Sequence, residues 1–178
     1  SLTPFDWVKG KPRAAVQAPA ALDGTIKLTD IQKVSNQSAL PIHQVTLKPL
    51  TDSVWVYQVT TTNGVDIYDA QTAQLLSPLS EEFARTIALN DYSGEGHIQS
   101  ALLITDLPQE VRGRDAAQWQ LQFSDAVSTT LYVDSQTGRL SARRNTVWRI
   151  YDFFWMLHIM DYSDRSNFNN PLLITTAI

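Results

Sequence analysis

His158 is the residue of this 178-residue chain whose chemistry is most suggestive of a site. An imidazole binds haem iron well, so one hypothesis makes His158 an axial haem ligand. Met156 and Met160 lie two positions to either side, and neither could share the same iron from one helix, so a second ligand would come from elsewhere in a longer protein. The alternative is a hydrogen-bonded histidine in the protein interior. His43 and His97 are interpreted as ordinary strand residues.

Positive charge is concentrated in one stretch, which carries Arg139, Arg143, Arg144 and Arg149. This cluster is either a solvated face or a contact for an anionic lipid or an acidic partner beside a membrane. The formal net charge of −4 and the lack of a dense Lys/Arg stripe argue against nucleic-acid binding. The candidate binding residues are Arg143, Arg144, Arg149, Trp148 and Trp155.

Several classes of enzyme site have no support in the sequence. The absence of cysteine removes thiol nucleophiles, thiolate metal sites and iron–sulfur clusters. No Gly-x-Ser-x-Gly elbow and no glycine-rich phosphate loop occurs among the seven glycines. The adjacent Glu81 and Glu82 are explained by the positive end of a helix dipole. We therefore expect this stretch of chain alone to be non-catalytic, with no cofactor or metal of its own.

The composition, 43% hydrophobic and 18% charged, is that of a folded chain. Hydrophobic periodicity and capping residues predict helices and strands in a repeating order. The pair Asn63-Gly64 predicts a type I′ hairpin turn. The predicted helices cover residues 28–39 and a segment starting at Ser80, and the predicted strands cover 42–50, 54–61, 65–69, 97–105, 118–124, 129–134 and 139–143.

The two series of elements match each other. The segment Asp69-Ala-Gln-Thr-Ala-Gln-Leu75 returns 65 positions later as Asp134-Ser-Gln-Thr-Gly-Arg-Leu140, with Asp, Gln, Thr and Leu in the same places. Upstream, Trp55 and Trp119 lie 64 positions apart, each in an alternating strand. The order helix, strand, strand, strand in both halves indicates an internal duplication.

The shared turn is not identical in its two copies. Gly138 suits a turn position with positive φ, which costs a non-glycine residue about 1 kcal/mol. Ala73 occupies the equivalent position, so the first copy is expected to be looser or differently turned. The predicted organisation is an extended N-terminal arm at 1–27, a first repeat at 28–79, a second repeat at 80–144, and an aromatic helix with a tail at 145–178.

The segment from Asn145 to Tyr162 is predicted to form a helix that is apolar over most of its circumference. Its charged residues are Arg149, Asp152 and Asp161. Two placements satisfy this pattern: a core helix that fastens the two repeats together, or a helix at a membrane surface with Trp and Tyr at headgroup level. The final segment, 171–178, is either the start of a transmembrane helix or a terminal strand that packs on the body.

These features resemble a tandem pair of PepSY domains. The resemblance spans about residues 28–175, and its repeat motifs lie at Val65–Leu75 and Thr130–Leu140. The aromatic segment Trp148–Tyr162, followed by Phe168–Leu173, is similar to the segment that enters a transmembrane helix in PepSY-associated membrane proteins of Gram-negative bacteria. The resemblance implies an α+β fold, two antiparallel sheets each crossed by a helix, and a place on the periplasmic side of the inner membrane, held by flanking helices.

The resemblance also implies two functions. PepSY units elsewhere are proposed to bind or restrain peptidases, so the first hypothesis is a non-catalytic extracytoplasmic binding or regulatory module that binds peptides or a peptidase. Some membrane-bound relatives take part in iron-siderophore reduction or flavin-linked electron transfer. The alternative is therefore the periplasmic portion of a haem-containing membrane reductase, in which His158 or transmembrane histidines outside this chain hold the haem.

Overall fold

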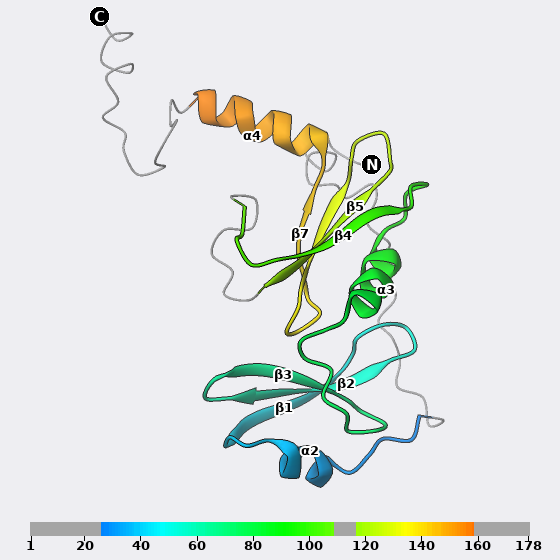
Figure 1. The fold of residues 1–178 in the computed structure, drawn as a ribbon, viewed down its shortest axis with the longest axis vertical. Coiled ribbons are helices and arrows are strands. Elements are labelled where there is room, and N and C mark those ends of the chain that lie inside the picture. The colour runs from blue at the N-terminus through cyan, green and yellow to red at the C-terminus, as the bar shows by residue number, and fades with distance from the viewer. Residues whose placement is uncertain (1–25, 109–116, 159–178) are drawn as a thin grey trace, which may run out of the picture.

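The structure, a computed structural model, describes residues 26–108 and 117–158. It confirms the predicted α+β class: two antiparallel sheets of three and four strands follow each other along the long axis of the molecule (Figure 1). Most of the predicted N-terminal arm, and everything predicted beyond His158, lies outside the described residues. The elements are α2 (Ile31–Gln37), β1 (Ile42–Pro49), β2 (Trp55–Thr61), β3 (Gly64–Asp69), α3 (Glu81–Asp91), β4 (Ile98–Ile104), β5 (Gln118–Phe123), β6 (Thr130–Asp134), β7 (Leu140–Arg144) and α4 (Thr146–His158).

The first unit consists of α2, the sheet β1-β2-β3 and the chain up to Leu79. Alternate side chains of β2 face α2, so Trp55 and Tyr57 pack in one buried cluster with Val34. The helix predicted over 28–39 is confirmed but shorter. The side chain of Asp30 caps its first turn.

The β2–β3 hairpin lies where Asn63-Gly64 predicts it, but the turn type predicted is wrong. Thr61 pairs with Gly64, so Thr62 and Asn63 form the two-residue loop and Gly64 begins β3 with φ of 142°. A type I′ turn requires positive φ at both central residues, and Asn63 does not have it. The hydroxyl of Thr61 accepts a hydrogen bond from the Asn63 amide at 3.3 Å, which holds the alternative turn.

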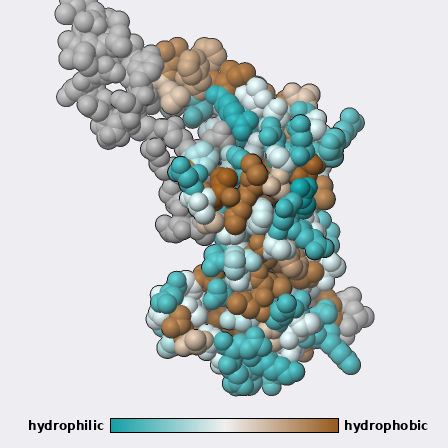
Figure 2. Space-filling model, viewed as in Figure 1, coloured by the Kyte–Doolittle hydropathy of each residue, from teal (hydrophilic) through white to brown (hydrophobic). Residues whose placement is uncertain are grey.

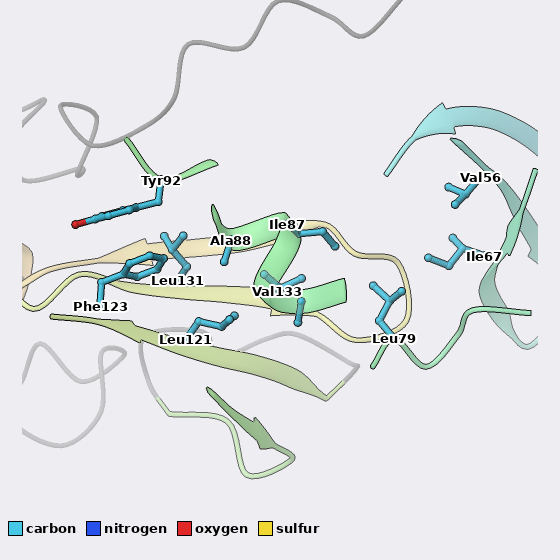
Figure 3. Close-up of a cluster of buried hydrophobic side chains, with 11 residues drawn as sticks. Val56, Ile67, Leu79, Ile87, Ala88, Tyr92, Leu121, Phe123, Leu131 and Val133 are labelled. Carbon is cyan, nitrogen blue, oxygen red and sulfur yellow. The ribbon is translucent and has the colours of Figure 1, made fainter. Parts of the chain in front are cut away.

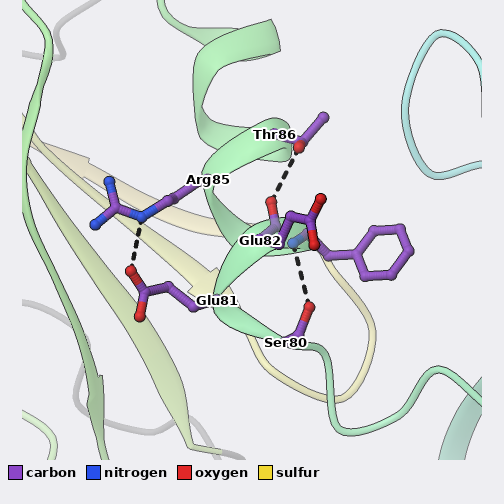
Figure 4. A network of polar contacts seen from close by, with 6 residues as sticks. Ser80, Glu81, Glu82, Arg85 and Thr86 are labelled. Atoms are coloured by element: carbon purple, nitrogen blue, oxygen red, sulfur yellow. Dashed lines mark hydrogen bonds and ion pairs between the residues drawn. The ribbon is translucent and has the colours of Figure 1, made fainter.

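The second unit consists of α3 and the sheet β4-β5-β6-β7. As predicted, α3 begins after Ser80, whose hydroxyl accepts a hydrogen bond from the Phe83 amide (Figure 4). Glu81 and Glu82 lie in the first turn, where the helix dipole favours negative charge. Glu81 also pairs with Arg85 one turn later, at 2.7 Å. The face of α3 that packs on the sheet buries Ala84, Ile87 and Ala88.

One hydrophobic cluster crosses the boundary between the two units. Val56 and Ile67 are fully buried on the side of the first sheet that faces away from α2. They belong to the same cluster as Leu79, Ile87 and Leu131 of the connection, α3 and the second sheet (Figure 3). Because these side chains share one core, the two units are packed together rather than joined by a free linker.

The chain that connects the units is also fixed by hydrogen bonds. The hydroxyl of Ser77 accepts from the Ile67 amide at 2.8 Å and donates to the Gln136 carbonyl at 2.6 Å. The Leu79 amide donates to the Ser135 carbonyl at 2.6 Å. The second unit therefore contacts the first through the turn that follows β6.

The two Asp-x-x-Thr turns have the same geometry, so the prediction of a looser first copy is wrong. In each, one carboxylate oxygen of the aspartate accepts hydrogen bonds from the amides two and three residues later. Both distances are 2.8 Å at Asp69 and both are 2.9 Å at Asp134. The fifth residue is left-handed in both: Ala73 has φ of 65° and Gly138 has φ of 68°. Alanine adopts the conformation of glycine here, at a cost in backbone strain.

The strands upstream of these turns align differently from the prediction. Tyr57 pairs with Tyr68, and Trp119 pairs with Val133, in each case one residue before the aspartate of the turn. Trp119 therefore corresponds to Tyr57 and not to Trp55. The loop between β5 and β6 is longer than the two-residue loop between β2 and β3. This difference in loop length gives Trp55 and Trp119 nearly the same sequence spacing as the two turns, although they are not equivalent in the sheets.

The helix α4 does not fasten the two units together, so that predicted placement is wrong. None of the residues Thr146–His158 is buried, and the helix projects from the end of β7 (Figure 1). Asn145, buried before the helix, accepts a hydrogen bond from the Trp148 amide at 2.7 Å, as expected of a cap. The Thr146 amide donates to the Val127 carbonyl at 2.8 Å. These contacts hold the start of α4 on the second unit.

Candidate functional site

A groove of about 1070 Å³ lies between the two units. It exists because the second unit covers only part of the first sheet's inner face, the face that points away from α2. The groove wall on the first unit includes Lys48, Gln58 and Val65, and the wall on the second unit includes Gln136 and Arg139. Its lining is mixed: apolar residues such as Leu40 and Leu103 lie beside polar groups suited to hydrogen bonding.

Lys48 is the half-buried cation of this groove. Its ammonium group donates to the Thr137 carbonyl at 3.3 Å and forms no ion pair with any residue that the structure describes. Burial lowers the pKa of Lys48; Asp134 raises the pKa and Arg139 lowers it further. Asp66 and Asp134 also line the groove, so an anionic ligand group would be favoured only beside Lys48 and Arg139.

The edge of β3 beside the groove is open at one point. The Ile67 amide is taken by the Ser77 hydroxyl, and the Ile67 carbonyl accepts from the Leu76 amide at 2.8 Å. Val65 lies two residues earlier, so its N–H and C=O point to the same edge. Backbone groups on such an edge can pair with another extended chain.

The predicted arginine cluster is divided in the structure. Arg139 is exposed at the end of β7 that borders the groove, whereas Arg143 lies near the other end of that strand. Arg143 is ion-paired with Asp91 of α3, and its side chain is only 12% exposed. Burial lowers the pKa of Arg143. This arginine fastens α3 to β7.

The junction of β7 and α4 holds the other predicted binding residues. The guanidinium of Arg144 lies 4.1 Å from the centre of the Trp148 ring, a cation–π contact. Arg149 donates to the Thr130 hydroxyl at 3.2 Å. Arg144, Trp148 and Arg149 thus gather at one place, and their contacts orient the start of α4 on the sheet.

The polarity of α4 is inverted relative to an ordinary surface helix. Ile150, Phe154 and Leu157 follow one another at helical spacing and are 53%, 60% and 42% exposed. The charged Arg149 and Asp152 lie on the opposite side and are half-buried. In Figure 2, α4 is a largely hydrophobic projection from the body. Surface helices normally show the reverse arrangement, so the outward face of α4 is a candidate contact surface.

His158 is exposed at the last described position of α4, so the interior placement is wrong. Its ring lies 6.1 Å from that of Trp155, which stacks in turn on Tyr151 at 6.3 Å. Axial haem ligation by His158 stays a prediction, because the chain beyond this residue lies outside the described range.

One serine and one histidine come within hydrogen-bond reach. Ser124 Oγ lies 2.9 Å from His97 Nδ1, and both residues are exposed. The carboxylate of Asp125 is not directed to this pair, because it accepts hydrogen bonds from Thr129 and Tyr92. We interpret the contact as a link between the start of β4 and the end of β5, since no third group among the described residues orients the imidazole.

Comparison of the chain with protein-family models, with curated proteins and with solved structures finds no match. Within residues 26–108 and 117–158, no helix combines the length and apolarity needed to cross a bilayer. The same residues bring together no group of three or more His, Asp or Glu side chains that could hold a metal ion.

Lys48 and Val65 are groove residues that no sequence motif predicts. The groove arises from the packing of one unit on the other, and no local pattern reports that packing. A partial signal existed: Lys48 and Gln58 occupy alternate positions that face away from α2, where a sheet covered on both sides would carry apolar residues.

Proposed function

We propose that this chain is a non-catalytic extracytoplasmic binding and regulatory module of a bacterial inner-membrane protein, with a peptide segment as its ligand. The ligand belongs to a free peptide or to a protein partner such as a peptidase. Support comes from the resemblance to paired PepSY domains and from the two units, each with a helix packed on an antiparallel sheet and each containing the same Asp-x-x-Thr turn.

The observation that carries the proposal is the groove between the units. It combines the half-buried cation Lys48 with the open edge of β3 at Val65. An extended peptide would pair its backbone with Val65 and place an acidic side chain against Lys48 and Arg139. Such binding needs no reaction, and a ligand that contacts both walls stabilises the present arrangement of the two units.

Fluorescence anisotropy with labelled peptides tests this proposal. A pentapeptide of alternating valine and glutamate is expected to bind, and its lysine-for-glutamate counterpart is expected to bind more weakly. Replacing the cation in Lys48→Met removes a charge-assisted hydrogen bond worth about 1.5–3 kcal/mol, so the affinity for the acidic peptide is expected to fall roughly tenfold or more. The variant should still fold, because burial already disfavours the charged form of Lys48.

Lys33→Met is the matched control, since Lys33 is an exposed lysine of α2 outside the groove. This variant is expected to bind the acidic peptide as the unsubstituted chain does. Equal losses in the two variants, or no binding of either peptide, would contradict the proposal.

A further inference from the structure

The outward face of α4 needs a partner of defined chemistry. It presents Ile150, Phe154 and Leu157, with Phe153 beside them at 56% exposure, while the charged side of the helix faces the protein. Leaving several large apolar side chains half exposed on a projecting helix is unfavourable in water, by about 25 cal/mol for each Å². An exposed apolar face of this kind marks a contact surface.

We propose that this face of α4 rests in the interfacial region of a lipid bilayer, with the helix axis along the membrane surface. The inference deepens the membrane attachment in the proposed function and rests on it. It assigns the contact to α4 itself, and it orients the molecule with the second unit next to the membrane and the first unit away from it (Figure 1).

The placement of aromatic residues favours lipid over a protein partner. At 100° per residue, Trp148, Tyr151 and Trp155 form a stripe between the apolar face and the charged side of α4. Tyr151 and Trp155 stack on each other along this stripe, with ring centres 6.3 Å apart. Tryptophan and tyrosine prefer the boundary between acyl chains and headgroups, which is the depth that this stripe would occupy.

The sequence around α4 contributes two further observations. Asp161, Asp164 and Arg165 follow the helix, and from residue 166 to 178 no charged side chain occurs. At the other end of the helix, Arg144 lies on the Trp148 ring and places positive charge beside the stripe, where anionic headgroups are attractive partners. This positive charge at the start of α4 therefore favours an anionic lipid surface.

Flotation of the chain with vesicles of equal parts phosphatidylcholine and phosphatidylglycerol tests the inference. The unsubstituted chain is expected to float with the vesicles. Ile150→Gln and Phe154→Gln each remove one inserted side chain and are expected to lower the partition coefficient roughly tenfold. Both residues are more than half exposed, so the urea unfolding midpoint should not change.

Leu89→Gln is the matched control, because Leu89 is 52% exposed on a different helix, α3. It is expected to float as the unsubstituted chain does. Equal flotation of Leu89→Gln and Phe154→Gln would overturn the inference, as would a dimer in solution that Phe154→Gln dissociates, since a second copy would then cover the face. Peptide binding by Phe154→Gln is measured in parallel: if it persists while flotation of the unsubstituted chain fails, the lipid contact is wrong and the peptide-binding function stands.

Discussion

The turns after β3 and β6 share one backbone geometry but have different surroundings. Ala73 and Gly138 occupy the same position with φ of 65° and 68°. Ala73 is 1% exposed and packs with the cluster beneath α2. Gly138 instead lies where the two units meet, and a Cβ built on it would come within 2.5 Å of Leu50 Cδ1. The left-handed conformation is required in both turns, but only the second requires the absence of a side chain.

This difference shows what holds the two units together. The turn after β6 provides the carbonyls that accept from Ser77, Leu79 and Lys48. Its backbone can approach the first unit closely because Gly138 has no side chain. In the first unit, the pairing of Tyr68 with Leu75 is an isolated bridge, whereas the matching chain of the second unit continues as β7. The turn after β6 thus forms part of the interface between the units, whereas the turn after β3 packs in the cluster beneath α2.

Gly138→Ala is expected to have the largest effect on stability. The left-handed backbone costs alanine about 1–2 kcal/mol, and the added methyl group must displace Leu50, Leu79 and Ile87, whose nearest atoms would lie 2.5–3.1 Å away. Urea unfolding should show a total loss of about 2–4 kcal/mol. A loss below 1 kcal/mol would mean that the interface moves aside easily, and the contrast between the two turns would be lost.

The aspartates of the two turns give the next comparison. Asp134→Ala and Asp69→Ala each remove the acceptor of two backbone amides. The amides after Asp69 are exposed and can bind water, so that substitution should cost about 1 kcal/mol, whereas those after Asp134 are partly buried and should cost about 2–3 kcal/mol. Chemical denaturation of the two variants under one condition measures the difference. Equal costs would show that burial at the interface does not distinguish the turns.

The sequence predicted the fold better than it predicted the sites. Alternation, capping and the repeated Asp-x-x-Thr motif are local signals, so the strands, α3 with its Ser80 cap and the position of both turns could be predicted. The turn type predicted for Asn63-Gly64 was wrong because the hydroxyl of Thr61, a neighbour outside the motif, accepts a hydrogen bond from the Asn63 amide. Lys48 became a groove residue only through the packing of two units, which a single sequence does not report.

The aromatic helix shows the same limit. Its composition correctly indicated a helix that is apolar on most sides, but composition allowed both a buried and a surface position. The structure decides between them, since no residue of α4 is buried. The separation of Arg139 from Arg143 also could not be predicted from the sequence, because residues close in sequence on a strand can lie at opposite ends of a sheet.

Ala73→Gly is expected to have the smallest effect, because its stabilising and destabilising contributions nearly cancel, whereas those of Gly138→Ala add. Glycine relieves about 1–2 kcal/mol of left-handed strain. Against this, the substitution removes one buried methyl group, worth about 0.8 kcal/mol, and raises the entropy of the unfolded chain by a similar amount in free energy. Urea unfolding should therefore place this variant within about 1 kcal/mol of the unsubstituted protein. A loss above 2 kcal/mol would show that the α2 cluster requires the Ala73 methyl group as strictly as the interface requires glycine at position 138. The two turns would then contact different parts of the molecule but would specify their fifth residue equally strictly.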